Sequence, residues 1–223
     1  LIAVSGNPDF QFLHKRYKTL KYEGDDVVDL DTYETPSKSG EKILAFISEP
    51  VISDERALDQ ANKLTRGYNE KIVLKILIES IVKIGQPFKV VLIPHPRQNK
   101  SELKNFWSEL GGDIYGGVVN NKNSKSTIFT SHGVIGMAST LLYESWLLGK
   151  PVLSIQPGLQ INSLRRLSLL NEFLMIEDQN QAVEKVIEWL ANIPIKPIFK
   201  LRPEATQHNN ASKFIVKKIN ALS

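Results

Sequence analysis

The chain has 223 residues, of which 42% are hydrophobic and 23% are charged, and its formal net charge is +4. This composition is ordinary for a globular protein, and the length suffices for one large domain with further elements at its ends. The absence of cysteine excludes disulfides, thiolate metal sites and cysteine nucleophiles. The basic residues are scattered, with no stripe of basic and aromatic side chains. We therefore expect small anionic ligands or contact with a membrane surface, and no nucleic acid.

Residues 1–40 are expected to lie outside the main domain. The apolar run at residues 1–4 has the pattern of a buried strand, and Pro8 favours a helix that continues to Leu20. Residues 22–40 are polar, acidic and interrupted by glycine and proline, which is typical of a linker. Because the chain starts within an apolar run, we interpret residues 1–40 as the remnant of a preceding domain plus a linker.

From residue 41 to residue 193, predicted strands alternate with predicted helices. The predicted strands are Lys42–Ile47, Phe88–Ile93, 113–119, 134–135, Val152–Ile155 and 173–176. The predicted helices are 54–84 with an interruption near Gly67, 101–110 with Ser101 as its N-cap, one beginning at Ser139, 163–170 and 179–191, while 120–126 is predicted to be a polar loop. This alternation predicts a Rossmann-like α/β domain, three layers deep (αβα), with a mostly parallel sheet.

Residues 194–223 are expected to form a proline-rich crossing segment followed by a final helix at 204–222. No apolar run in these 223 residues is long enough to span a membrane, and no signal-peptide pattern is present. We therefore expect a cytoplasmic location, with contact at the inner face of the membrane.

The segment 133–158 carries the clearest chemical signal. It has the pattern of a strand, a tight turn, a helix, a second turn and a strand. Ser139 and Thr140 stand where the helix begins, so the first-turn amides can be capped by a hydroxyl or can bind a phosphate. Glu144 lies on the same helix face as Thr140, on a largely apolar helix where a carboxylate needs a partner. The segment predicts a nucleotide, with its diphosphate on the amides of residues 136–140 and its ribose on Glu144.

Three other predicted strands also end in chemically distinctive residues. His95 lies between two prolines, which restrict the backbone and hold the imidazole ready to donate a proton or a hydrogen bond. Arg97 follows closely and can clamp a phosphate with its fork of N–H groups. Ser48 and Glu49 end the first strand of the alternating region, and Gln156 ends the strand at 152–155. Because ligands bind at the carboxyl ends of parallel strands, these residues are expected to line one cleft.

Each of these features also has a structural interpretation. The helix at Ser139 could be an ordinary capped helix, and Glu144 could be a solvated side chain. His14, His132 and His208 are interpreted as structural or exposed, and the acidic run at 29–31 as a solvated segment. The histidines lack the spacing of zinc ligands, and there is no P-loop, so we predict neither a metal site nor a bound cofactor.

The residues 136–144, GMASTLLYE, followed by 149–158, GKPVLSIQPG, resemble the nucleotide-binding, C-terminal half of glycosyltransferases with the two-domain GT-B fold. The pair His95-Pro96 resembles the His-Pro turn of bacterial sialyltransferase-like and capsule-type enzymes, which make surface polysaccharides from CMP- or UDP-sugars. The resemblance covers roughly residues 42–191. It implies that this domain is one half of a GT-B fold and that the N-terminal domain, which supplies the acceptor site, is missing.

The resemblance also implies the partners and the site. The donor would be a UDP-, CMP- or GDP-linked sugar, and the acceptor a glycan or a lipid-linked molecule, with no bound metal required. Donor phosphates are expected at Ser139 and Thr140, ribose at Glu144, and the sugar near Gln156 and His95. The full set of candidate residues is His95 as the catalytic residue, with Ser139, Thr140, Glu144, Gly136, Met137, Arg97, Gln156, Ser48 and Glu49 as substrate-binding residues.

Three alternatives to a glycosyltransferase stay open at this point. Two are enzymes, a nucleotide-sugar epimerase of the same fold and a CDP-alcohol phosphotransferase. The third is a non-catalytic domain that binds a nucleotide or pairs with another chain. Fold analogy does not decide among them, because function resides in the site.

Overall fold

The computed structural model describes residues 40–58, 65–119, 124–161, 173–198 and 200–208. The strand and helix expected within residues 1–20 lie outside these ranges, as do nearly all of the expected linker and the helix expected at 163–170. The final helix expected at 204–222 is described only as far as residue 208, where residues 203–208 form a 3-10 helix, η7 (Pro203–His208).

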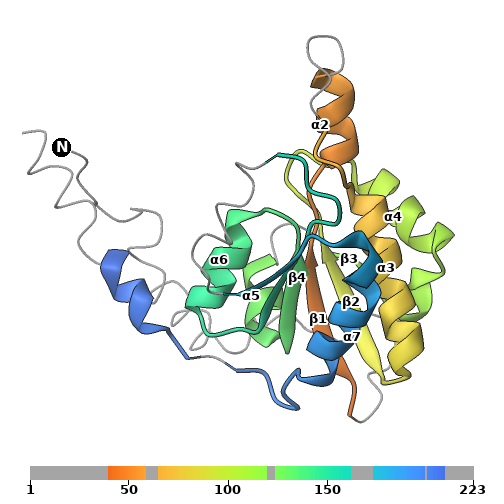
Figure 1. The fold of residues 1–223 in the computed structure, drawn as a ribbon. Helices are drawn as coiled ribbons and strands as arrows, with labels where there is room; N and C mark the ends of the chain where they lie inside the picture. The colour runs from red at the N-terminus through yellow and green to blue at the C-terminus, as the bar shows by residue number, and fades with distance from the viewer. Residues whose placement is uncertain (1–39, 59–64, 120–123, 162–172, 199, 209–223) are drawn as a thin grey trace, which may run out of the picture.

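Within the described residues, six parallel strands form one sheet in the order β3-β2-β1-β4-β5-β6 (Figure 1). The strands are β1 (Lys42–Ile47), β2 (Phe88–Ile93), β3 (Gly116–Val118), β4 (Gly133–Gly136), β5 (Val152–Ile155) and β6 (Leu174–Ile176). In the register of the central strands, Leu44 lies opposite Val90 of β2 and Gly133 of β4. The strand order reverses between β1 and β4, which places a ligand-binding crevice at the carboxyl ends of these two strands.

Helices cover both faces of the sheet (Figure 1). The helices are α2 (Val51–Leu58), α3 (Glu70–Ile84), α4 (Lys100–Glu109), α5 (Ser124–Thr130), α6 (Thr140–Leu147) and α7 (Ala182–Ala191), with short 3-10 turns η3 (Gly112–Ile114) and η6 (Gln179–Gln181). Helices α3, α4 and α7 lie on one face and α5 and α6 on the other, while α2 projects beyond the carboxyl edge of the sheet. The predicted Rossmann-like α/β fold is confirmed.

The hydrophobic core explains why the strand sequences are almost continuously apolar. Leu44 and Phe46 of β1 pack into the core on the α3 side, whereas the intervening Ala45 and Ile47 pack into the core on the α6 side. All four side chains are buried. A parallel sheet covered on both faces has no solvent-facing positions to fill with polar residues.

The start of the helix predicted over 54–84 is wrong, because helix α2 already begins at Val51. The chain is not helical from residue 65 to residue 69. The interruption predicted near Gly67 is confirmed, because Gly67 has a backbone φ of +90° that a helix does not accommodate. Helix α3 then starts afresh, with the side chain of Asn69 accepting a hydrogen bond from the N–H of Ile72 at 3.0 Å.

Three further local predictions differ from the structure. The N-cap of α4 is Asn99 and not Ser101, since Asn99 Oδ1 accepts from the N–H groups of Ser101 and Glu102 at 3.0 and 3.3 Å. The end of the predicted polar loop is helical, because α5 starts at Ser124. Its Ile128 is fully buried against the α6 side of the sheet, so tertiary packing overrides the weak helix propensity of its serines and threonines. The predicted strand at 113–119 is shortened to β3 by the η3 turn.

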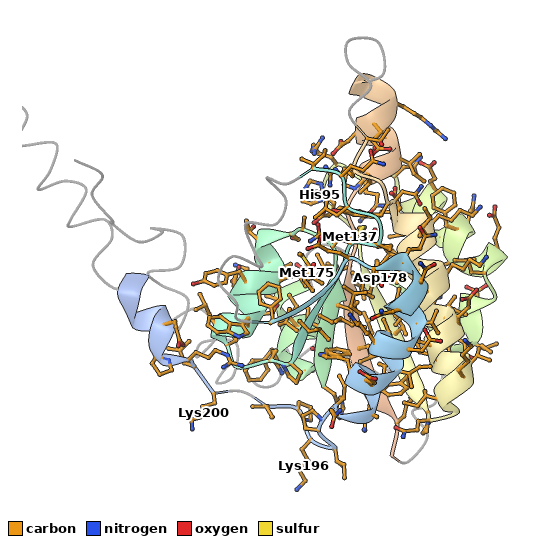
Figure 2. The ribbon with its side chains drawn as sticks, viewed as in Figure 1. His95, Met137, Met175, Asp178, Lys196 and Lys200 are labelled. Carbon is orange, nitrogen blue, oxygen red and sulfur yellow. The ribbon has the colours of Figure 1, made fainter. Side chains whose placement is uncertain are left out.

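At the amino ends of the strands, opposite the carboxyl edge, the sheet is held by structural contacts. His132 Nδ1 accepts from the N–H of Ile43 at 2.9 Å, and its ring also forms a hydrogen bond with the backbone of Ile195. Lys150 is fully buried there and donates to the carbonyl oxygens of Phe129 and Ser131, and burial lowers the pKa of its ammonium to about 8. Lys196 and Lys200 point away from the domain at this end (Figure 2). No helix in the described ranges combines the length and apolarity needed to cross a membrane.

Candidate functional site

A cavity of about 240 Å³, the charged cavity, opens at the carboxyl ends of β1, β2 and β4. Its polar lining comprises Glu49, Asp54, Arg66, His95, Arg97 and residues 138–140. These residues come from the end of β1 and helix α2, the loop before α3, the turn after β2 and the start of α6. The structure therefore brings three of the predicted strand ends together where the strand order reverses. Figure 2 shows His95 and Met137 near this edge, below α2.

Two arginines and two carboxylates form a chain of ion pairs across the charged cavity. Arg66 Nη1 lies 3.1 Å from Glu49 Oε2, and Arg66 Nη2 lies 3.5 Å from Asp54 Oδ2. Arg97 Nη1 lies 3.0 Å from the other oxygen of Asp54. The Arg66 side chain is 21% exposed and that of Arg97 is 66% exposed. Arg66 is thus largely buried in the wall. Most of the Arg97 side chain is exposed, and its Nη2 also donates to Asp54 Oδ2 at 3.4 Å.

Arg66 and Asp54 are candidate site residues that the sequence pattern did not indicate, because neither follows a strand. The predicted break near Gly67 marked the loop that carries Arg66. The sequence pattern did not indicate that this loop lies at the end of β1, because that arrangement depends on contacts between segments far apart in the chain.

The loop that carries Arg66 is fastened to the segment after β5. Gly67 packs so closely there that a Cβ at this position would lie 2.0 Å from the carbonyl oxygen of Gly158. The N–H of Gln160 donates to the carbonyl of Arg66 at 2.9 Å, and the hydroxyl of Thr65 donates to Gln160 Oε1 at 3.0 Å. These contacts hold the Arg66 guanidinium over the cavity.

The start of α6 forms the second wall of the charged cavity. Ser139 is the N-cap, as predicted, and its hydroxyl oxygen accepts from the N–H of Leu141 at 3.3 Å. The N–H of Ala138 donates to Glu49 Oε1 at 3.0 Å. The carboxylate of Glu49 therefore lies between the start of α6 and Arg66. These two groups are of the kind that binds a ligand anion. The next two amides, of Ser139 and Thr140, are those that helix geometry leaves for a ligand.

The protonation of Glu49 and His95 is set by burial. Burial raises the pKa of Glu49 above its usual value, against the opposing effects of Arg66 and the Ala138 N–H. Burial and the positive charge of Arg97 lower the pKa of His95, although Asp54 acts in the other direction. The N–H of Arg97 donates to His95 Nδ1 at 3.2 Å, which assigns the proton of the neutral ring to Nε2. In its neutral form, His95 therefore donates a hydrogen bond from Nε2.

A second cavity of about 230 Å³, the apolar cavity, adjoins the charged cavity and shares His95 and Ser139 with it. Its walls are mainly apolar side chains of Ile47, Ile93, Pro94, Pro96 and Leu141. Ser48 and Ser124 also line it. The Ser48 side chain is 1% exposed, and its hydroxyl has no hydrogen-bond partner within the described residues.

Gln156 and Met137 support the site from below. Gln156 Nε2 donates to the carbonyl of Met137 at 3.1 Å, and Gln156 Oε1 accepts from the hydroxyl of Tyr68 at 3.1 Å. Gly136 permits the close approach of β1 and β4, since a Cβ there would lie 3.0 Å from the carbonyl oxygen of Ile47. These contacts fix the turn that leads into α6.

Four predicted ligand contacts, Gly136, Met137, Glu144 and Gln156, are not part of either cavity wall. Gln156 is fully buried and Glu144 is 8% exposed, and neither lines the charged or the apolar cavity. The predicted contacts of Gln156 with a sugar and of Glu144 with ribose stay predictions. Across the described ranges, no three histidine or acidic side chains are grouped so as to hold a metal ion.

No protein-family model and no curated protein sequence matches the chain. Among solved structures, UDP-GlcNAc 2-epimerase from Neisseria meningitidis, bound to UDP-GlcNAc, is similar with a TM-score of 0.57 and 16% identity over 99% of this chain and 55% of that chain. The chain shares the fold of the matching half of this structure.

Two further structures give the same result. A putative UDP-N-acetylglucosamine 2-epimerase from Listeria monocytogenes has a TM-score of 0.54 and 14% identity over 98% of this chain and 52% of that chain. The S. aureus MnaA co-structure with UDP has a TM-score of 0.51 and 11% identity over 86% of this chain and 50% of that chain. The chain spans about half the length of these proteins.

Proposed function

We propose that this chain is the nucleotide-sugar-binding part of a two-domain glycosyltransferase of the GT-B type. The observation that carries the proposal is the convergence of Arg66, Arg97, His95 and the start of α6 on one cavity at the strand-order reversal. Open α/β sheets bind their ligands at such reversals, and helix starts together with arginine forks bind phosphates.

In the proposed complex, the donor diphosphate lies against the amides of Ser139 and Thr140. Arg97 turns from Asp54 toward the phosphate, while Arg66 stays in the wall. In the transfer, the bond from sugar C1 to the acceptor oxygen forms as the bond from C1 to the phosphate oxygen breaks. The electron pair leaves with the nucleotide, where the Nε2–H of His95 stabilises the developing charge.

The remaining parts of the reaction are assigned to a preceding domain. That domain would bind the glycan or lipid-linked acceptor and hold the base that takes the acceptor proton. Residues 1–40 would link it to the Rossmann-like domain at 41–193, and residues 194–223 would cross back to it. In this proposal, Glu144 accepts hydrogen bonds from the ribose hydroxyl groups.

A nucleotide-sugar epimerase is the second candidate. It is favoured by the structural comparison, because two of the similar structures are described as UDP-GlcNAc 2-epimerases. The two candidates differ in their products: an epimerase inverts a sugar carbon without an acceptor, whereas a transferase releases the nucleotide only when an acceptor is present.

The proposed function is tested by titrating the chain with UDP, CMP and GDP in a calorimeter. We expect saturable binding of at least one nucleotide. Arg97→Gln should weaken that binding about tenfold, as expected for the loss of one charge-assisted hydrogen bond. Arg56→Gln is the matched control, because Arg56 lies on α2 outside the cavity wall with 74% of its side chain exposed. Absence of saturable binding by all three nucleotides contradicts the proposal.

Nucleotide-sugar affinity is also expected to fall as the pH rises through the raised pKa of Glu49. The charged and polar groups facing Glu49 are Arg66, Asp54, Tyr68 and the Ala138 N–H, with Arg97 and His95 across the cavity. A bound anion further raises the pKa of Glu49, which burial already raises, so binding takes up a proton. A bound anion also favours protonation of His95, so this group likewise weakens binding as the pH rises. Burial lowers the pKa of His95 in the chain without ligand.

The measurement is a calorimetric titration of a nucleotide-sugar, whose diphosphate has no proton to lose in this pH range. The Glu49→Gln variant should bind more tightly at neutral pH and show a flatter pH profile. An affinity that rises with pH in the unchanged chain, or an unaltered profile in Glu49→Gln, would show that Glu49 does not face the bound anion.

A further inference from the structure

We propose that the apolar cavity holds the acylamino substituent of a sugar phosphate, with the Ser48 hydroxyl donating a hydrogen bond to the acyl carbonyl oxygen. The inference rests on the proposed function, because the phosphate of the same ligand occupies the charged cavity. It specifies the class of sugar that this site takes.

The first observation is the state of Ser48. Its side chain is 1% exposed, and its hydroxyl has no hydrogen-bond partner among the residues that the structure describes. A buried hydroxyl without a partner is unfavourable, and buried polar groups in folded proteins nearly always have one. Because Ser48 lines the apolar cavity, a ligand atom placed there can be that partner. A carbonyl oxygen accepts such a hydrogen bond.

The second observation is the apolar character of the walls. Isoleucine, proline and leucine make up five of the nine residues that line the cavity, and the polar ones are Ser48, His95, Ser124 and Ser139. A hydroxyl placed against the apolar side chains would lose its hydrogen bonds with water. An acetyl group instead presents one carbonyl for Ser48 and one methyl for the apolar walls. The cavity, at about 230 Å³, accommodates this substituent together with an edge of the sugar ring.

The third observation is the connection between the two cavities. They share His95 and Ser139, so a single ligand can enter both. A phosphate in the charged cavity places the sugar carbon that bears it at this shared wall. The substituent on the adjacent ring carbon then reaches the apolar cavity. This arrangement selects a 2-acylamino sugar over a sugar with a 2-hydroxyl group.

The test compares N-acetylglucosamine 1-phosphate with glucose 1-phosphate on the full 223-residue chain. These probes carry no nucleobase and differ only in the substituent at C2. We expect the acetamido sugar to bind about tenfold more tightly, the scale set by a methyl group in an apolar pocket together with one hydrogen bond. Ser48→Ala should reduce this ratio about fivefold. Ser108→Ala is the matched control, since Ser108 lies on α4 and bonds to Asp113 at 3.1 Å.

A second measurement covers the case in which Ser48→Ala does not fold. In the unchanged chain, N-acetylglucosamine 1-phosphate should shift the NMR signals of the Ile47 and Leu141 methyl groups more than glucose 1-phosphate does. Equal affinities for the two sugar phosphates, or equal methyl shifts, overturn the inference and leave the proposed function standing. If neither sugar phosphate binds, the inference is also overturned, and the nucleotide titration shows separately whether the charged cavity binds its ligand.

Discussion

Replacing Arg66 with methionine is expected to lower the free energy of unfolding by about 3 kcal/mol and to abolish measurable nucleotide binding. Arg66 is the ion-pair partner of Glu49, whose side chain is 10% exposed. Removing the guanidinium leaves that carboxylate buried with only the Ala138 N–H to offset its charge. Binding is lost because the unpaired negative charge of Glu49 then faces the ligand phosphate.

The prediction is checked by urea denaturation and by nucleotide titration of three variants. Adding Glu49→Gln to Arg66→Met should recover most of the lost stability, since the buried charge is removed along with its partner. The double variant should still bind nucleotide more weakly than the unchanged chain. Arg56→Met serves as the control for loss of an arginine in the same region. Equal stability of the single and double variants would show that Glu49 is not the source of the loss.

Replacing Gly67 with alanine is expected to lower the free energy of unfolding by about 3 kcal/mol through strain and steric overlap combined. Gly67 has a φ of +90°, and a Cβ would lie 2.0 Å from the carbonyl oxygen of Gly158. Because that oxygen belongs to the backbone, no side-chain rotation relieves the overlap. The loop must move, and Arg66 moves with it, so nucleotide binding should weaken as well.

Gly85→Ala separates the two causes. Gly85 caps α3 with a φ of +63°, and a Cβ there would have no atom within 4 Å. Only the strain of a left-handed backbone applies, so the expected loss is about 1 kcal/mol and nucleotide affinity should not change. Thermal or urea unfolding of both variants checks the difference. A Gly67→Ala variant as stable as Gly85→Ala would show that the loop is not held tightly against Gly158.

Strand positions were predictable because short apolar runs are bounded by residues that stop a strand. The bounds of β1, β2 and β5 agree with the prediction, and Ser139 caps α6 as its hydroxyl indicated. Helix α5 was not predictable, because its polar sequence becomes helical only when Ile128 packs against the sheet. Asn99 and Ser101 are both suitable caps for α4. The N-cap is Asn99, because its side chain reaches the free amides of the first turn.

The candidate site was predictable only in part, for a related reason. Strand ends of a parallel sheet gather at one edge in any such fold, so Ser48, Glu49, His95 and Ser139 could be grouped from the sequence. The strand pattern alone was therefore sufficient to predict a parallel sheet and the polar residues at its carboxyl edge. Only the tertiary structure placed Arg66 against Glu49 and separated a charged cavity from an apolar one. Those contacts depend on a loop held by Gly67 against Gly158, and local patterns carry no information about packing between segments so far apart in the chain.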